Sequence, residues 1–511
     1  MQSCFFRSIH ERGTSISKTI RLVDTTLRDG SQSLWALRMR AGMMLPAMAD
    51  LDSAGFEAIE FVVPSAQFAR AVRDLKEDPW VWIRKGAALA KRTPLRLHGS
   101  IGPYFANVPL CIQELFLDKL REVGISTTRT SDPWNDFDNS VEEFDLLRRK
   151  DFGGVINLIY SVSPRHTADY YAARTRQALK LRPMAICFKD VGGLLTPDAA
   201  RELIPVVLRE AGDVDVEFHA HCNNGLAPFT VMIAAESGIK TIHTAIPPLA
   251  NGSSQPSVFN VVENLRSKGF NVDLDLAPLE RVRDHFYSAA KDEGLPQGIP
   301  NEFDQGLYRH QVPGGMISNM VFQLEKLGMG DRINEVLEET ARVREELGYP
   351  IMVTPLSQIV GTQAAINVVT GQRYGIVSDE VIEYAMGYRG REATDVMDQN
   401  IRDVILGRSR ADEVRARHSA GRGGATLEEV RRQYGGKCSD DELIVRVFAG
   451  VGDTELDLDH GEHVPQSYDE YKASRRSVKD LVHELVNSDH GMNYFRYHAP
   501  HEKLLIAGKL K

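Results

Sequence analysis

One stretch, AICFKDVGGLLTPDAARELIPVVLREAGDVDVEFHAH at residues 185–221, holds a complete strand–helix–strand pattern. Two short runs typical of β-strands, Ala185–Lys189 and Val216–His221, flank a segment with helical spacing, Pro197–Ala211. Thr196 before Pro197 is a common helix start, because proline at the first helical position leaves no amide hydrogen unpaired. The stretch therefore predicts two parallel strands joined by a helical crossover.

The same alternation recurs through the first half of the chain. The other strand-type runs are Ile20–Arg28, Phe56–Val63, Leu95–Ile101, Ile125–Ser131, Val155–Val162 and Thr241–Ile246. Eight strands alternating with helices over about 230 residues predict an α/β fold of the (β/α)8 TIM barrel type. An open doubly wound sheet is the alternative, but no GxGxxG sequence follows the first strand to favour it.

After about Asp275 the pattern changes to amphipathic helices such as Ile333–Leu347. We expect four parts along the chain. They are an N-terminal arm (1–19), the barrel (20–275), a mainly helical domain (276–450) and a C-terminal tail with a helix near 478–486 (451–511).

Composition is that of an ordinary globular protein, with 42% hydrophobic and 26% charged residues. The 61 basic and 70 acidic residues give a net charge of −9, which does not favour nucleic-acid binding. The five cysteines form no CxxC pair, so a disulfide framework or a thiolate zinc cluster is not expected. No apolar run approaches the roughly 20 residues that span a bilayer, so no membrane insertion is expected and a cytoplasmic location is the default expectation.

Polar residues gather at the predicted ends of three strands. Asp29 is expected to close the first strand, Lys189 the sixth and His221 the seventh. His219 and His221, two residues apart on a strand, point to the same face. A lone HxH pair or strand-end Asp is more often structural, but together they supply the three or more ligands that a divalent ion needs. We therefore expect a metal site at the carboxyl ends of the strands, where barrel enzymes place their active sites.

Lys189 does not fit a metal site in its ordinary form. A protonated ammonium cannot ligate a cation, and a buried lysine beside Asp190 is typical of an ion pair or a Schiff-base lysine. Carboxylation of the amine to a carbamate would turn Lys189 into a carboxylate-like ligand.

Seven segments in a fixed order resemble the carboxyltransferase family of biotin-dependent enzymes. This family includes the oxaloacetate decarboxylase α subunit, the pyruvate carboxylase B subunit and the transcarboxylase 5S subunit. The resemblance covers about Ile20 to Val447. Its segments are Asp24–Asp29 (DTTLRD), Lys189–Pro197 (KDVGGLLTP), His219–His221 (HAH), Gly252–Ser257 (GSSQPS), Val312–Asn319 (VPGGMISN), Val353–Gln363 (VTPLSQIVGTQ) and Cys438–Glu442 (CSDDE).

The resemblance implies roles for individual residues. Asp29, carboxylated Lys189, His219 and His221 would hold a divalent metal, usually Zn, Mn or Co. Three further residues would act beside it. Arg28 would stabilise an enolate-like oxygen, Gln32 would hydrogen-bond the substrate, and Ser318 would bind biotin and relay a proton between biotin and the substrate carbon.

The third strand departs from the family pattern. Pyruvate-using relatives end it with an Arg-Gly-Gln-Asn-type motif, whose arginine grips the substrate carboxylate. Here Leu95–Asn107 reads LRLHGSIGPYFAN, with Ser100 or a neighbour at the aligned position and no arginine after Arg96. His98 or Arg129 is a candidate substitute, although Arg129 fits a structural ion pair equally well. We therefore expect a carbonyl-containing acceptor other than pyruvate.

The resemblance also implies partners. No Met-Lys-Met biotinylation motif follows the helical domain, so biotin is expected on a separate biotin carboxyl carrier protein, together with a biotin carboxylase subunit. A homo-oligomer is expected, as in relatives. Two alternatives keep the barrel: a biotin-independent metal-dependent lyase, aldolase or decarboxylase of the HMG-CoA lyase-like family, and a non-catalytic scaffold subunit.

Overall fold

The computed structural model describes residues 19–99, 108–312, 317, 320–321, 324–388, 390–419, 425–452, 456–475, 494–499 and 502–507. The predicted N-terminal arm, apart from Thr19, and the predicted helix near 478–486 lie outside these residues.

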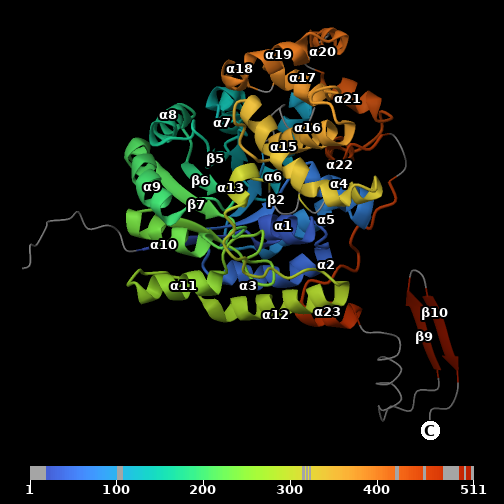
Figure 1. Cartoon of the computed structure of the whole chain (residues 1–511). Helices are drawn as coiled ribbons and strands as arrows, with labels where there is room; N and C mark the ends of the chain where they lie inside the picture. Colours follow the sequence, from blue (N-terminus) through green and yellow to red (C-terminus); the bar gives the residue numbers. More distant parts are fainter. Residues whose placement is uncertain are drawn as a thin grey trace, which may run out of the picture.

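Eight parallel strands close into a barrel in the order β1 to β8, which confirms the predicted (β/α)8 fold (Figure 1). Closure is made by β1 and β8, where Arg21 pairs with Thr241 and Asp24 with Thr244. The strands are β1 (Arg21–Asp24), β2 (Ala58–Val62), β3 (Leu95–His98), β4 (Thr127–Ser131), β5 (Gly153–Ile159), β6 (Ala185–Asp190), β7 (Asp215–Ala220) and β8 (Thr241–Thr244).

The first strand ends five residues before Asp29, so the prediction that Asp29 closes it is wrong. The Asp24 carboxylate accepts hydrogen bonds from the amide and hydroxyl of Thr26, at 3.2 and 2.5 Å. Such a local side-chain bond turns the backbone out of the extended conformation. The next residues coil into one wide turn, Thr26–Gly30, in which the amides of Asp29 and Gly30 both donate to the Thr25 carbonyl.

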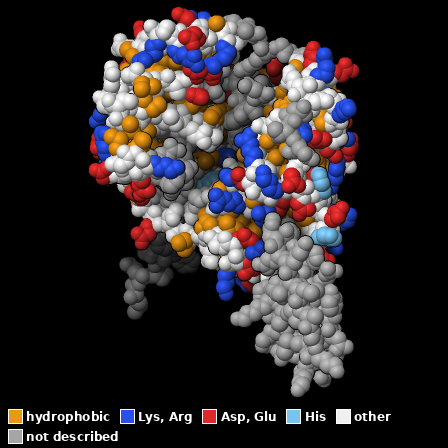
Figure 2. Space-filling view, turned by 90° about the vertical axis from the view of Figure 1, so that its right-hand side faces the viewer, with side chains coloured by type: hydrophobic (Ala, Val, Ile, Leu, Met, Phe, Trp, Pro, Cys, Tyr) orange, Lys and Arg blue, Asp and Glu red, His pale blue; other side chains and the backbone are white. Residues whose placement is uncertain are grey.

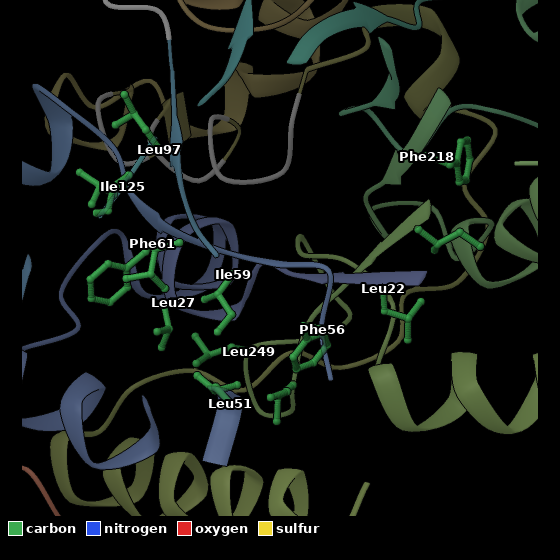
Figure 3. Packing of buried hydrophobic residues seen from close by; sticks show 14 of the residues in the cluster. Leu22, Leu27, Leu51, Phe56, Ile59, Phe61, Leu97, Ile125, Phe218 and Leu249 are labelled. Carbon is green, nitrogen blue, oxygen red and sulfur yellow. The ribbon is translucent and has the colours of Figure 1, made fainter. Parts of the chain in front are cut away.

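Helices surround the barrel and bury its outward-facing strand residues. In α9 (Pro197–Ala211), as predicted, the Thr196 hydroxyl accepts the Ala199 amide at 3.1 Å, and Leu203, Ile204 and Val207 are buried. Figure 3 shows Leu22, Ile59 and Phe61 of the strands packed among residues of the surrounding segments. The other barrel helices of eight or more residues are α5 (Pro79–Leu89), α6 (Leu110–Glu122), α7 (Val141–Arg149), α8 (Ala168–Leu179), α10 (Ala227–Ser237), α11 (Val258–Ser267) and α12 (Leu276–Glu293).

A second group of helices has its own hydrophobic core, which includes Val343, Val360 and Tyr384. These helices lie together on one side of the barrel, in yellow and orange in Figure 1. They are α15 (Ile333–Glu346), α16 (Leu356–Thr370), α17 (Asp379–Ala385), α18 (Arg391–Val396), α19 (Gln399–Leu406) and α20 (Ser409–Ser419). The helices α13 (Leu307–His310) and α21 (Leu427–Gln433) instead pack against the barrel core, through Leu307, Tyr308 and Val430.

The second group packs on loops that follow the barrel strands. Arg344 of α15 donates to the Ser161 hydroxyl at 3.1 Å and to the Val162 carbonyl at 3.0 Å, just after β5. The Tyr308 hydroxyl of α13 donates to the Leu194 carbonyl, after β6, at 3.0 Å. Because these loops leave the carboxyl ends of the strands, the second group, together with α13, covers the end of the barrel where an active site is expected.

On the face drawn in Figure 2, acidic and basic side chains are interspersed. Among the helices that the structure describes, none combines the length and the apolar character needed to cross a membrane.

Helix α22 (Asp440–Ala449) returns from the second group to the barrel wall. Its Phe448 is 6% exposed, and its ring centroid lies 4.8 Å from that of Phe116 and 5.5 Å from that of Phe68. Replacing Phe448 with alanine should lower the free energy of unfolding by about 3 kcal/mol, because a large buried ring leaves a cavity. Urea unfolding followed by tryptophan fluorescence measures this change.

Phe229→Ala is the matched control, because Phe229 is 62% exposed and its removal should change the free energy of unfolding by less than about 0.5 kcal/mol. Equal effects of the two substitutions would show that α22 does not support the barrel.

Candidate metal centre

Three predicted ligands meet at the mouth of the barrel. Nε2 of His219 lies 3.1 Å from Nε2 of His221. The Oδ2 atom of Asp29 lies 3.2 Å from the first of these nitrogens and 3.6 Å from the second. All three residues are buried, and their donor atoms lie within 4.8 Å of one another. The wide turn after β1 thus delivers Asp29 to the same point as the end of β7.

The hydrogen bonds of the two imidazoles decide which nitrogen carries the proton. Glu217 accepts from His243 Nε2 at 2.9 Å, so the other nitrogen of His243 can accept from His219 Nδ1 at 3.0 Å. His221 Nδ1 donates to the Ser253 carbonyl at 2.7 Å. Both Nε2 atoms therefore present lone pairs toward Asp29. Two lone pairs and a carboxylate facing one point repel one another, and a divalent cation at that point satisfies all three.

Burial and charge keep these groups in the protonation states that a metal requires. Burial, with Arg129 nearby, lowers the pKa of His219 well below its usual range, so the ring is neutral. Burial acts to raise the pKa of Asp29, but the charge of the adjacent Arg28 acts against burial, and that pKa is held well below normal. The residues present fit a divalent metal ion.

Lys189 ends next to this cluster, in register with His219 on the neighbouring strand. It is 8% exposed, and burial, with Arg129 nearby, lowers its pKa to about 7. Asp190 does not pair with it. The Asp190 carboxylate instead accepts the amides of Leu194 and Leu195, at 3.0 and 2.8 Å, and so closes the loop after β6.

Arg28 is held by two carboxylates. Its Nη2 lies 2.8 Å from Asp29 Oδ2 and 2.5 Å from Glu60 Oε2, and its Nε donates to Glu60 at 3.0 Å. Arg129 also grips Glu60 with two bonds, at 2.5 and 2.9 Å, and is fully buried. Arg129 therefore has the structural ion-pair role that its sequence position left open.

A buried charged network fills the barrel below the cluster. Arg96 pairs with Glu217 at 2.9 Å, and Glu217 holds His243. Cys187, Glu217 and His243 also bring donor atoms within 4.8 Å of one another, but Arg96 and Arg129 already compensate this group. Sequence reasoning missed Glu60, Glu217 and His243, because a single charged residue in a strand does not reveal which face is inside.

The remaining predicted site residues are not gathered into the cluster. Gln32 is exposed on α1 (Ser31–Trp35), one turn after Asp29. Ser318 and Ser100 lie outside the described residues.

A closed (β/α)8 barrel that gathers a donor set able to hold a metal ion at its carboxyl ends, covered by a helical domain, is the architecture of a barrel enzyme. Residues 307–483 match the family model described as the conserved carboxylase domain. The chain is 38% identical over 391 residues to the pyruvate carboxylase B subunit of Methanocaldococcus jannaschii, covering 76% of this chain and 68% of that protein.

Two other relatives carry different substrate names. The methylmalonyl-CoA carboxyltransferase 5S subunit of Propionibacterium freudenreichii is 32% identical, over 76% of this chain and 77% of its own length. The 2-oxoglutarate carboxylase large subunit of Hydrogenobacter thermophilus is 30% identical, over 89% of this chain and 71% of its own length.

The fold matches that of a solved relative. The carboxyl transferase domain of Rhizobium etli pyruvate carboxylase superposes with a TM-score of 0.73, covering 84% of this chain and 76% of that chain at 24% identity. The chain belongs to the carboxyltransferase family of biotin-dependent carboxylases, and it is an enzyme of that family. The relatives support this interpretation and not the alternative of a biotin-independent lyase or aldolase.

Proposed function

We propose that this chain is a metal-dependent carboxyltransferase that moves a carboxyl group between carboxybiotin and a carbonyl-containing acceptor. The observation that carries the proposal is the convergence of the two Nε2 lone pairs, of His219 and His221, on Oδ2 of Asp29. A bound divalent metal, taken as Zn, Mn or Co, would supply Lewis-acid polarisation of the acceptor carbonyl.

Carboxylated Lys189 completes the proposed ligand set. A neutral amine reacts with carbon dioxide to give a carbamate and a proton, whereas an ammonium has no lone pair for this reaction. The lowered pKa of about 7 supports this step, since about half of the side chain is neutral at pH 7. An ordinary lysine, with a pKa of about 10.4, is almost fully protonated there.

Arg28 is proposed to stabilise the enolate-like oxygen that develops on the acceptor. Its bonds to Asp29 and Glu60 fix the guanidinium beside the ligand set before substrate arrives, which favours electrostatic stabilisation. Gln32 is proposed to hydrogen-bond the substrate, and Ser318 to bind biotin and relay the proton. These two assignments rest on the family resemblance.

The acceptor is proposed to differ from pyruvate. At the end of β3, His98 is 8% exposed, and its Nδ1 has no hydrogen-bond partner among the described residues. Burial, with Arg28 and Arg129 nearby, lowers the pKa of His98 well below normal. A neutral imidazole can bond a carbonyl or hydroxyl, but it does not offer the bidentate charge that holds a small carboxylate.

The proposed partners are a biotin carboxyl carrier protein, which delivers carboxybiotin, and a biotin carboxylase subunit, which charges it. The names of the relatives as subunits support this proposal. A homo-oligomer remains a prediction.

The adduct on Lys189 gives the direct test. Intact-protein mass spectrometry in bicarbonate buffer should show an addition of about 44 Da on the parent that is absent from Lys189→Ala. Since carbamate formation needs the neutral amine, the modified fraction should rise from pH 6 to pH 8 and level off above the pKa of about 7.

The unsubstituted protein and the Lys189→Ala variant should also differ in activity and in metal content. Lys189→Ala should lower carboxyl transfer from a carboxybiotin carrier on the order of a hundredfold or more. Lys85→Ala is the control, because the Lys85 ammonium donates to the Gly461 carbonyl and, among the described residues, makes no hydrogen bond with the site. Metal-free parent protein, with Lys189→Ala as active as the parent, would exclude the proposed centre.

A further inference from the structure

Gln255 lies directly against the three-ligand cluster. It is fully buried in the loop after β8, where the main-chain amide of Asn251 donates to the main-chain carbonyl of Gln255 at 2.7 Å. A backbone bond from the Ala245 amide to the Pro256 carbonyl, at 3.1 Å, ties this loop to the end of β8. The backbone of Gln255 is therefore held in place from both sides, and it fixes the position from which the side chain extends.

The terminal Nε2 atom of Gln255 lies 3.3 Å from Nε2 of His219 and 3.1 Å from Nε2 of His221. With metal–ligand distances of about 2.0–2.2 Å, neighbouring donors around one ion lie about 2.8–3.6 Å apart. The distances among Asp29, His219 and His221 fall in this range, and so do both distances from Gln255. The Gln255 amide thus occupies a donor position of one coordination shell.

The two ends of a glutamine amide exchange on a half-turn, and the hydrogen-bond network decides which end faces the cluster. With Nε2 toward the histidines, the amide donates to both lone pairs, and Oε1 accepts from the Thr25 hydroxyl at 2.7 Å. This arrangement suits a centre that holds no cation.

The opposite orientation is also satisfied at Thr25. The Thr25 hydroxyl lies 2.9 Å from the Thr244 carbonyl, so it can donate there while it accepts from the Gln255 amide nitrogen. The hydroxyl has one hydrogen and cannot donate to both neighbours at once. In this second state the Gln255 carbonyl oxygen faces the point where the lone pairs and the Asp29 carboxylate converge.

We propose that Gln255 is a further residue of the divalent-metal centre, with an amide that turns between two orientations set by Thr25. It donates its N–H groups to His219 and His221 when the centre is empty, and it presents its carbonyl oxygen to the cation when the centre is filled. A carbonyl oxygen is a suitable hard donor for a divalent ion. The inference rests on the proposed metal function of Asp29, His219 and His221, and it adds a residue to that set.

The test is a titration of chelator-treated protein with Co²⁺, followed by visible absorption and by metal content at equilibrium. Gln255→Leu removes the carbonyl donor and keeps much of the volume. It should weaken Co²⁺ binding about tenfold to a hundredfold and change the shape of the absorption band. Gln255→Glu places a carboxylate oxygen at the same position and should tighten Co²⁺ binding at least severalfold relative to the parent.

Gln113→Leu is the matched control, because Gln113, on α6, is also a buried glutamine but its amide donates to the Val108 carbonyl, just before that helix. It should bind Co²⁺ as the parent does.

Different results would overturn the role of Gln255 and the metal centre itself. If the parent binds Co²⁺ and Gln255→Leu has the same affinity and spectrum, Gln255 is not part of the centre, while the proposed function stands. If Gln255→Leu does not fold, Gln255→Glu decides: an affinity equal to or weaker than that of the parent overturns the inference. If the parent itself binds no Co²⁺, the metal centre and the inference both fall.

Discussion

Replacing His219 with alanine is expected to remove most metal binding and to lower carboxyl transfer on the order of a thousandfold. His219 is fully buried, and its Nε2 lone pair lies 3.1–3.2 Å from the donor atoms of His221 and Asp29. Alanine leaves one imidazole and one carboxylate, which hold a divalent ion much more weakly than three preorganised donors.

Comparing His219→Ala with His243→Ala distinguishes the proposed ligand, His219, from His243, the residue that orients it. His243 fixes the proton of His219 but offers no atom to the proposed ion. His243→Ala should therefore weaken metal affinity only about tenfold to a hundredfold, the effect typical of an orienting partner. Metal content after dialysis and transfer from a carboxybiotin carrier are the two measurements.

His285→Gln is the control for loss of a buried imidazole, because the one hydrogen bond of His285 within the described part of the chain is to the Met43 carbonyl, on the outer side of the barrel. It should keep full metal content. If His219→Ala kept one equivalent of metal with an affinity within about threefold of the parent, the ligand assignment would be wrong.

Replacing Glu60 with glutamine is expected to have the largest effect on stability, a loss of about 3–5 kcal/mol in the free energy of unfolding. Glu60 is fully buried and is the shared partner of Arg28 and Arg129. Burial alone would raise its pKa, but Arg129 and Arg28 outweigh burial and keep the carboxylate ionised. Glutamine keeps the shape and removes the charge, so two buried guanidinium groups lose their counterion.

Glu57→Gln is the matched control, because Glu57 pairs with Arg21 at 3.4 Å and its side chain is 40% exposed. An exposed pair of this kind contributes less than about 1 kcal/mol. Urea unfolding of both variants measures the contrast.

Adding Arg129→Met to Glu60→Gln extends the test. The double variant should lose less stability than the sum of the two single losses, because each single change leaves a buried partner uncompensated. Additive losses, or equal losses for Glu60→Gln and Glu57→Gln, would mean that the network does not hold the barrel interior together.

The sequence predicted the strands well because each reads as a short apolar run with helical spacing between runs. Each of the eight predicted runs overlaps an observed strand, and α9 begins at the predicted Thr196-Pro197 start. The largest error lies at β1, where Asp24 bonds Thr26 and ends the strand early. A side-chain bond that competes with the sheet is not visible in hydrophobic spacing.

The site was predictable where its residues share one strand. His219 and His221 were placed on one face by their spacing alone, and strand order then placed Lys189 beside them. Asp29, Lys189 and the two histidines also belong to segments that resemble the family. Gln255 also lies in such a segment, Gly252–Ser257, but the resemblance implied no role for it. Glu60, Glu217 and His243 gave no such signal, since each is an ordinary polar residue in its own segment.

The sequence by itself determined the fold class, the order of the strands and the identity of the donor atoms, because these depend on local periodicity and on residue chemistry. Only the tertiary structure decided which charges share the barrel interior and which nitrogen of His219 and of His221 faces Asp29. Closing the barrel brings β2, β4, β7 and β8 around one axis and excludes water from their inner faces. In that setting each buried polar atom requires a partner, and the set of partners fixes the protonation and direction of every donor.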